Sequence, residues 1–193
     1  QEQVKETLIP LICEQLCKAK IPSISQEAEV PVVGLVKFGA SGLGVESLHF
    51  LQEHTKIELH TDAIKIHIQH IDSAAKKLDW WYSRCSFPKI KDKGKATVQV
   101  KAASIFVAFN VFFTSSKPRL EVSAAEFGIG TLDMRVSSTF ASCIYNQILS
   151  SLKSEIQTAI EQGLQQAVMS LGPPAQIISP LSLPDAPGGA EES

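Results

Sequence analysis

The spacing of hydrophobic positions changes twice along the chain and divides it into three regions. In residues 3–20 the apolar side chains recur at every third or fourth position, namely at Val4, Leu8, Leu11, Ile12 and Leu16. This spacing predicts an amphipathic helix. Pro10 lies within the stretch and either kinks the helix or marks its true first turn, because proline removes one intrahelical donor.

Residues 29–137 follow a period of two, with Gly and Ser clusters between the alternating runs, which predicts a strand-rich region. In one clear case, three isoleucines alternate with polar residues over 64–69, so one face is expected to be buried and the other wet. Residues 96–113 differ, because the first half alternates whereas 105–113 is apolar on both faces except for Asn110. Such a long strand is expected to pass from one environment into a more fully covered one.

Residues 139–171 return to helical spacing without a break, through Phe140, Ile144, Ile148, Leu152, Ile156, Ile160, Leu164, Val168 and Leu171. Ser138 and Thr139 are plausible caps, and Gly172 with the two prolines after it is a stop signal. A helix of this length measures about 50 Å at 1.5 Å per residue. Because that exceeds the width of a compact domain of this mass, the fold is predicted to be elongated.

The segment after residue 171 holds five of the ten prolines, and its last ten residues have a composition typical of disorder. The predicted organisation is one α+β domain over residues 1–184, followed by a disordered tail over 185–193.

The composition fits a globular domain that buries its own core. Of the 193 residues, 44% are apolar and 20% are charged, and the formal net charge is −2. The near-neutral charge argues against a nucleic-acid binder. No stretch reaches the roughly 18 apolar residues of a membrane span, and the first residues lack the pattern of a signal peptide. We therefore expect a soluble chain, and secretion after removal of a signal stays open.

Four cysteines occur, at positions 13, 17, 85 and 143, and they form no CxxC pair. A structural zinc site is therefore not expected. Cys13 and Cys17 are one helical turn apart and are expected to be free core residues rather than a bridge. Whether the four cysteines form any disulfide stays open at this point.

The sequence offers no catalytic set. The glycine-rich segment 39–44 (GASGLG) departs from the nucleophile elbow, the dinucleotide fingerprint and the phosphate loop, and predicts a turn between two strands. The five histidines have no carboxylate or cysteine at ligand spacing, so we expect them to be solvated or hydrogen-bonded. His67 and His70 should point to opposite sides if their strand continues. We predict a protein that is not an enzyme and needs no metal or cofactor.

Two features suggest binding. The segment 84–95 concentrates positive charge opposed only by Asp92, through Arg84, Lys89, Lys91, Lys93 and Lys95. We interpret these five cations as one loop that suits phosphate head groups or anionic membranes. A solvated hairpin that resists edge pairing explains them equally well.

The second feature is the excess of apolar positions on two helices of unequal length beside an extended sheet. This arrangement permits an apolar cavity between sheet and helices, which periodicity cannot distinguish from a filled core.

The same order of elements resembles one half of the bactericidal/permeability-increasing protein and lipopolysaccharide-binding protein family. The residues that carry the resemblance are 16–25 (LCKAKIPSIS), the Trp-bearing strand 78–82 (LDWWY), the segment 88–100 (PKIKDKGKATVQV) and the helix 140–168. The pattern W-x-Y followed by P-x-x-x-D-x-G-x-A-x-V-x-V looks particularly like plant and protist members. The resemblance spans about residues 1–185.

This resemblance implies an elongated tubular fold, in which a highly curved antiparallel sheet wraps around one long C-terminal helix and one shorter N-terminal helix. It also implies non-enzymatic binding or transfer of phospholipid or lipopolysaccharide at anionic membrane surfaces. An extracellular, antimicrobial role in innate immunity is the corresponding expectation.

The resemblance also implies roles for individual residues. The head-group role falls to Arg84, Lys89, Lys91, Lys93 and Lys95, and the lining of an apolar pocket for acyl chains falls to Leu8, Ile12, Leu16, Ile144, Ile148, Leu152 and Ile156. The alternative function is a partner-binding structural module with a filled core and a basic docking loop.

Two departures from the family pattern matter. Many animal members tie a late strand to the start of the long helix by a disulfide, and Cys143 stands where the helix end of that bridge would be. Residues 127–130 hold no cysteine, so the bridge is expected to be missing. Full-length members have two such halves, so the chain is either a single-domain relative or the N-terminal domain of a longer precursor.

Overall fold

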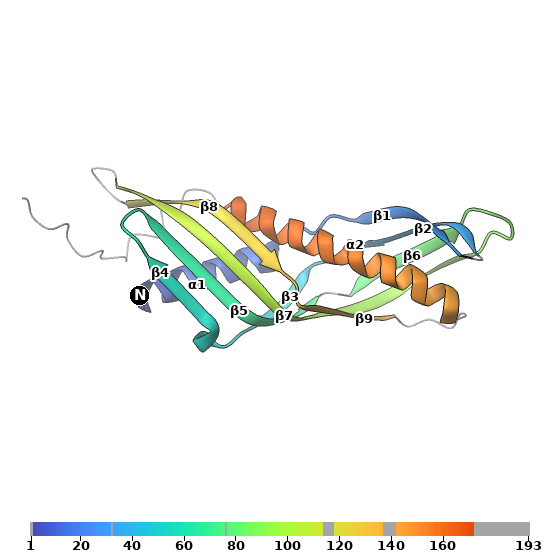
Figure 1. Cartoon of the computed structure of the whole chain (residues 1–193), viewed down its shortest axis with the longest axis horizontal. Coiled ribbons are helices and arrows are strands. Elements are labelled where there is room, and N and C mark those ends of the chain that lie inside the picture. The colour runs from blue at the N-terminus through green and yellow to red at the C-terminus, as the bar shows by residue number, and fades with distance from the viewer. Residues whose placement is uncertain (1, 32, 76, 114–117, 137–141, 172–193) are drawn as a thin grey trace, which may run out of the picture.

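The computed structural model describes residues 2–31, 33–75, 77–113, 118–136 and 142–171. Within these residues, two α-helices run along an elongated antiparallel sheet of nine strands (Figure 1). The helices are α1 (Glu2–Lys18) and α2 (Ser142–Met169), with a short 3-10 helix, η1 (Gln52–His54). The strands are β1 (Ile24–Val30), β2 (Gly34–Ser41), β3 (Val45–His49), β4 (Thr55–Leu59), β5 (Ala63–Ala75), β6 (Leu78–Arg84), β7 (Lys91–Phe113), β8 (Pro118–Gly128) and β9 (Thr131–Val136).

The α+β class predicted from the sequence is confirmed, as is the presence of two helices. α1 contains Pro10 in its interior, so this proline does not mark the first turn. α2 has 28 residues, which corresponds to about 42 Å. The predicted caps at positions 138 and 139 and the tail from residue 172 lie outside the described residues.

Strand β7 organises the sheet, because it changes neighbours along its length. Its first part pairs with β6 and β9, and its second part pairs with β5 and β8. The remaining order is β1-β2-β6 on one side, with β3 and β4 both paired to β5 on the other. This 23-residue strand therefore changes neighbours along its length, but the fuller cover predicted for residues 105–113 holds only for 105–109, because Phe112 is 44% and Phe113 is 65% exposed.

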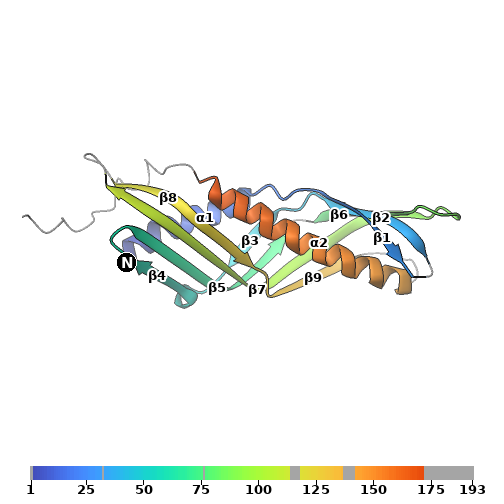
Figure 2. The ribbon, with the colours of Figure 1, turned by 45° about the horizontal axis from the view of Figure 1, so that its top comes forward.

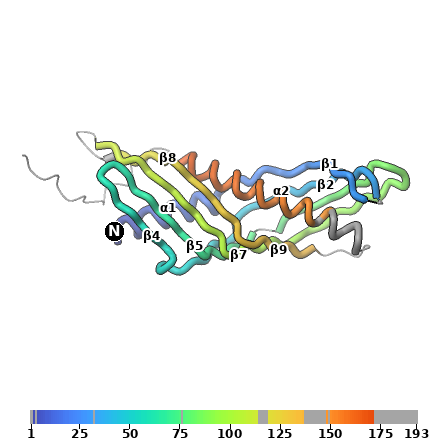
Figure 3. Tube along the Cα trace, in the orientation of Figure 1, coloured from blue at the N-terminus to red at the C-terminus, as the bar shows by residue number. Residues whose placement is uncertain are grey.

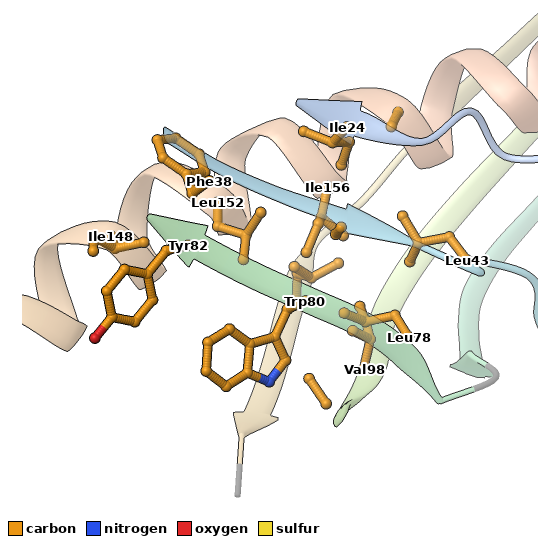
Figure 4. Packing of buried hydrophobic residues seen from close by; sticks show 14 of the residues in the cluster. Ile24, Phe38, Leu43, Leu78, Trp80, Tyr82, Val98, Ile148, Leu152 and Ile156 are labelled. Atoms are coloured by element: carbon orange, nitrogen blue, oxygen red, sulfur yellow. The ribbon is translucent and has the colours of Figure 1, made fainter. Parts of the chain in front are cut away.

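Two hydrophobic cores lie end to end along the molecule, one on each side of the point where β7 changes partners. The hairpin-side core joins β1, β2, β6, β9 and the first part of β7 to one face of α2, as Figure 4 shows. The α1-side core joins α1, β4, β5, β8 and the second part of β7 to Val168 near the end of α2. Ala103 and Leu164 pack against both cores. Two views agree that α2 extends along both halves (Figures 1 and 2).

The Trp-bearing strand shows how the sequence fixes one register of the sheet. Trp80 is buried and pairs with Gly94 on β7, whereas Trp81 points outward and pairs with Gly39 on β2. A Cβ atom on Gly94 would lie 3.1 Å from the Trp80 indole, and one on Gly39 would lie 2.8 Å from the Trp81 ring. Each indole therefore covers a glycine of the neighbouring strand, where a larger residue would displace it.

Candidate functional site

An apolar pocket lies where the two cores meet. Both helices contribute to it, together with β3, β5, β7, the end of β8 and the turn that follows it. The residues that line it are Leu16, Ile21, Gly44, Val45, Leu48, Ile71, Ser73, Ala75, Val100, Ala103, Ser104, Ile105, Phe127, Gly128, Ile129, Ile160 and Leu164. We call this space the central pocket.

The central pocket is almost wholly hydrophobic and narrow. Ser73 and Ser104 are the only lining residues with polar side chains. The empty space is about 530 Å³ when its open part is included. The cavity volume available to water is only about 40 Å³. The glycine, alanine and serine residues around it leave room that the larger residues of the two cores do not fill. Such a pocket suits a hydrocarbon chain better than a polar ligand.

Six of the seven predicted pocket residues have described side chains, and the structure distributes them over the central pocket, the two cores and a second hollow. Leu16 lines the central pocket. Leu8 and Ile12 are fully buried in the α1-side core, and Ile156 is fully buried in the hairpin-side core. Ile144 lies on α2, but its side chain is outside the described set.

The remaining two, Ile148 and Leu152, line a second apolar hollow with Trp80, Trp81, Tyr82, Met134 and Val136. Its empty space is about 280 Å³. Burial raises the pKa of the Tyr82 hydroxyl, and the Asp92 carboxylate raises it further, so the phenol remains protonated at neutral pH. This hollow is separate from the central pocket and smaller than it.

The prediction that the five cations share one loop is wrong. Arg84 belongs to β6, and Lys91, Lys93 and Lys95 belong to β7, which leaves Lys89 in the connection between the strands. β7 begins at Lys91, and its lysines alternate with other residues. The lysine side chains therefore lie on the exposed face of a hairpin. Figure 3 shows this β6–β7 hairpin at one end of the molecule, on the side of the N-terminal half of α2.

Two of these cations already have partners. The Arg84 guanidinium donates from Nε to the Val33 carbonyl oxygen at 2.6 Å and to Ser86 Oγ at 3.0 Å. Lys95 Nζ pairs with the Asp79 carboxylate at 2.9 Å. Arg84 thus fixes the hairpin to the start of β2 rather than facing a ligand. Lys89, Lys91 and Lys93 are exposed.

The hairpin also carries an aromatic residue that the sequence analysis did not single out. Phe87 is 91% exposed, the largest exposure among the exposed large apolar side chains of the described chain. It lies between Arg84 and Lys89 in the connection from β6 to β7. The signal in the sequence was an aromatic residue in the middle of the basic segment.

The histidines lie on β3, η1 and β5 and, for His60, in the connection after β4. His67 packs on Phe106 with ring centroids 4.5 Å apart, and His54 packs on His70 at 4.6 Å. The expectation that His67 and His70 point to opposite sides is wrong, because both line one shallow outer hollow. A register shift between Ile68 and Ile71, with a positive φ of 52° at His70, interrupts the alternation.

Catalytic and metal chemistry gains no support in the described part of the chain. No group of three or more His, Cys, Asp or Glu side chains there could hold a metal ion. Cys13, Cys17 and Cys85 are free. The glycine-rich segment 39–44 ends β2 and turns at Gly42, where φ is 77°, into β3, as the sequence predicts. No helix among the described residues is long and apolar enough to cross a membrane.

A solved structure of lipopolysaccharide binding protein is similar to this chain. The TM-score is 0.68 at 19% sequence identity, and the match covers 86% of this chain and 36% of that one. This chain thus spans little more than a third of the length of that protein. No protein-family model and no curated protein sequence matches the chain. At this identity the similarity concerns the fold, and the chain has the fold of the bactericidal/permeability-increasing and lipopolysaccharide-binding proteins.

Proposed function

We propose that this protein binds lipid without catalysis, holding acyl chains in the central pocket and contacting anionic head groups through the β6–β7 hairpin. The central pocket carries the proposal. It lies between two helices and a sheet and is partly open to solvent, and its lining has two hydroxyl groups as its only polar side-chain groups. Burying a methylene group of an acyl chain there is worth about 0.8 kcal/mol.

The narrowness of the central pocket bears on how lipid would enter. An acyl chain fills it only if lining side chains change rotamer or the walls separate, because little of the space admits even a water-sized sphere. Among the walls of the pocket, the short strand β3 has the shortest strand pairing, which joins Val45–His49 to β5 alone, and its Leu48 also packs against the α1-side core. A tubular wrap of the sheet around the helices would let such a wall move while the two cores stay packed.

The printed name of the similar solved structure supports lipid as the ligand class. That protein binds lipopolysaccharide, which contains acyl chains and phosphates, and this chain has its fold. Transfer between membranes, the choice between phospholipid and lipopolysaccharide, secretion and a role in defence remain predictions from the sequence resemblance.

The hairpin supports contact with anionic membranes. Lys89, Lys91 and Lys93 supply the positive charge, at about 1 kcal/mol for each lysine near an anionic surface. Phe87 supplies an apolar side chain in the position where the hairpin would meet the interface. Of the five predicted head-group cations, these three lysines are the ones we assign to this role.

Native mass spectrometry of protein purified without denaturants tests the pocket. We expect an adduct of phospholipid mass, identified after solvent extraction. Ala75→Leu should abolish the adduct by filling the central pocket, whereas Ala74→Leu should retain it, since the neighbouring residue points to the other face of β5. A lipid-free mass that persists after incubation with phospholipid and lipopolysaccharide vesicles would overturn the proposal.

Sedimentation with phosphatidylglycerol vesicles tests the hairpin. Replacing Lys89, Lys91 and Lys93 by Glu should abolish binding, and the same charge change at the exposed Lys18, Lys20 and Lys77 should weaken it much less. Phe87→Ser should lower affinity by about tenfold, because part of a phenylalanine's burial energy is lost. Phe113→Ser is the matched control, since Phe113 is 65% exposed at the opposite end of β7. Equal losses from both lysine sets would argue against a specific hairpin contact.

The alternative function, a partner-binding module with a filled core, is favoured by the small free volume of the central pocket. It predicts that Ala75→Leu stabilises the fold without any ligand to displace. A persistently lipid-free protein together with a stabilising Ala75→Leu substitution would make this alternative the better account.

A further inference from the structure

The five histidines of the chain all fall between positions 49 and 70. His54 and His70 occupy the centre of this group, because they line both of two adjoining outer hollows. Their ring centroids are 4.6 Å apart. The two side chains come from different elements, η1 and β5, so their contact fastens the segment after β3 to the sheet.

This histidine pair lies on the outside of a wall whose inside faces the central pocket. Leu48 of β3 lines both the outer hollow and the central pocket. On β5, His70 lines the outer hollow, and the next residue, Ile71, is buried and lines the central pocket. One layer of β3 and β5 therefore separates the histidine pair from the central pocket.

The pairing of strand β3 with the sheet is short and irregular. It has five residues, pairs with β5 alone, and has a register shift between Val45 and Ser47. The partner segment of β5 is also irregular, with register shifts on both sides of Ile71. Opening this segment would break the short β3–β5 pairing and the packing of Leu48 against the α1-side core, while the fully buried residues of both cores stay in place.

Protonation of the pair conflicts with its present packing. The Nδ1 atom of His54 is inaccessible to solvent and has no hydrogen-bond partner among the described residues. An imidazolium needs acceptors for both of its N–H groups, so a charged His54 would bury an unsatisfied donor. A charged His70 beside it would add repulsion, weakened by solvent because His70 is itself exposed. Both penalties disappear when the segment opens to water.

Neighbouring charges oppose this effect only in part. The Glu53 carboxylate lies 3.8 Å from His54 Nε2, but it is 73% exposed and thus well screened. Asp72 lines the same hollow, and its Oδ1 already accepts the Ala102 backbone N–H at 3.2 Å. Lys56 and Glu58 of β4 line the outer hollow that also contains His67. They form an ion pair there, with Lys56 Nζ 2.7 Å from Glu58 Oε1. His49 and His67 would add further positive charge on acidification.

We propose that protonation of His54 and His70 at mildly acidic pH releases β3 and η1 from β5 and opens the central pocket. The inference rests on the proposed function, since it makes the pocket's lipid exchange dependent on pH. Histidine side chains change charge between about pH 8 and pH 5. The open state takes up protons, so its population increases as the pH falls. Bound lipid is therefore retained at neutral pH and released in acid.

Lipid-free protein gives the first test, which does not depend on the proposed function. Amide hydrogen exchange, corrected for the intrinsic effect of pH, should show β3 opening about tenfold more at pH 5.5 than at pH 7.5, while Ile66 and Val107 stay protected. A double variant, His54→Gln with His70→Asn, should lose this pH dependence. Asn is chosen because it tolerates the positive φ at position 70. His60→Gln is the matched control, because His60 lines neither hollow.

The second test follows release of a fluorescent phosphatidylcholine from loaded protein to excess acceptor vesicles. We expect about tenfold faster release at pH 5.5 in the native chain and in His60→Gln, and less than twofold in the double variant. Circular dichroism at both pH values verifies that each variant is folded. If the double variant unfolds, the single variant His70→Asn is used in its place. Equal acid acceleration of exchange and release in the variants overturns the inference. A native chain that takes up no lipid but shows the histidine-dependent opening refutes the proposed function and keeps the switch.

Discussion

The two halves of the molecule are built alike but covered differently. The hairpin-side core packs its sheet against α2, whereas the α1-side core has α1 as its main helical cover and only the end of α2. Both are filled by large side chains, many of them fully buried. Between them, where β7 exchanges one pair of neighbours for another, the lining includes Gly44, Ala75, Ala103 and Gly128. The empty space of the central pocket therefore arises where the strand topology changes.

If each half has its own tightly packed core, truncating a fully buried residue in either should destabilise the protein strongly. Ile156→Ala on the hairpin side and Ile12→Ala on the α1 side should each lower the free energy of unfolding by about 2–5 kcal/mol. Urea denaturation followed by circular dichroism and tryptophan fluorescence measures both. Both tryptophans lie on β6, so fluorescence follows the hairpin side. Coincident transitions show that the halves unfold together, and separate transitions in Ile12→Ala would show that they do not.

Enlarging an alanine should distinguish the packed halves from the junction. Ala159 is buried in the hairpin-side core, and Ala159→Leu should cost about 1–3 kcal/mol through overpacking. Ala103→Leu extends into the central pocket and should cost less than about 1 kcal/mol. Thermal denaturation of the two variants compares them directly. An equal loss in both would mean that the junction is as tightly packed as the cores.

Within the hairpin-side half, the cations themselves divide into structural and exposed groups. Arg84→Ala removes one hydrogen bond that connects the hairpin to the Val33 carbonyl and one to Ser86 within the hairpin, and should cost about 1 kcal/mol. Lys93→Ala should change stability by less than about 0.5 kcal/mol, because its side chain is exposed. Denaturation midpoints measure the difference. Equal effects would remove the structural role that the geometry gives Arg84.

The sequence predicts the two helices, the strand-rich middle and the division of β7, because each leaves a period in the spacing of apolar residues. The spacing of apolar residues leaves open whether a cavity or a filled core lies between sheet and helices, and the pocket follows only from the family resemblance. Leu16 was assigned to that pocket from its position on the N-terminal helix, whereas Ala75 and Ala103 carry no pattern that distinguishes a space from a filled core. The void depends on how two sheet segments diverge, which is a property of pairing between distant strands.

The misplaced residues have local causes. The five cations seemed to share a loop because Lys, Pro and Gly are common in turns, yet the strand pairing extends to Lys91. His70 was assigned to the wrong face because alternation assumes a regular strand, and the register shift beside it cannot be recognised from residue types alone. Cys13 and Cys17 are free, as their helical spacing predicts, but the expectation that they are core residues is wrong, because Cys17 is exposed and Cys13 is only partly buried.

The α1-side half offers the smallest test of the comparison, through its thiols. Burial raises the pKa of Cys13, and the neighbouring Cys17 raises it further. Because the thiolate is the reactive form, Cys13 should be alkylated more slowly at pH 8 than the exposed Cys17. Cys17→Ser should accelerate the reaction of Cys13 only slightly, since burial is the larger cause, whereas urea should accelerate it much more. Peptide mapping after timed treatment with iodoacetamide measures both rates. A large acceleration in Cys17→Ser would mean that charge, and not cover by the packed α1-side half, controls this thiol.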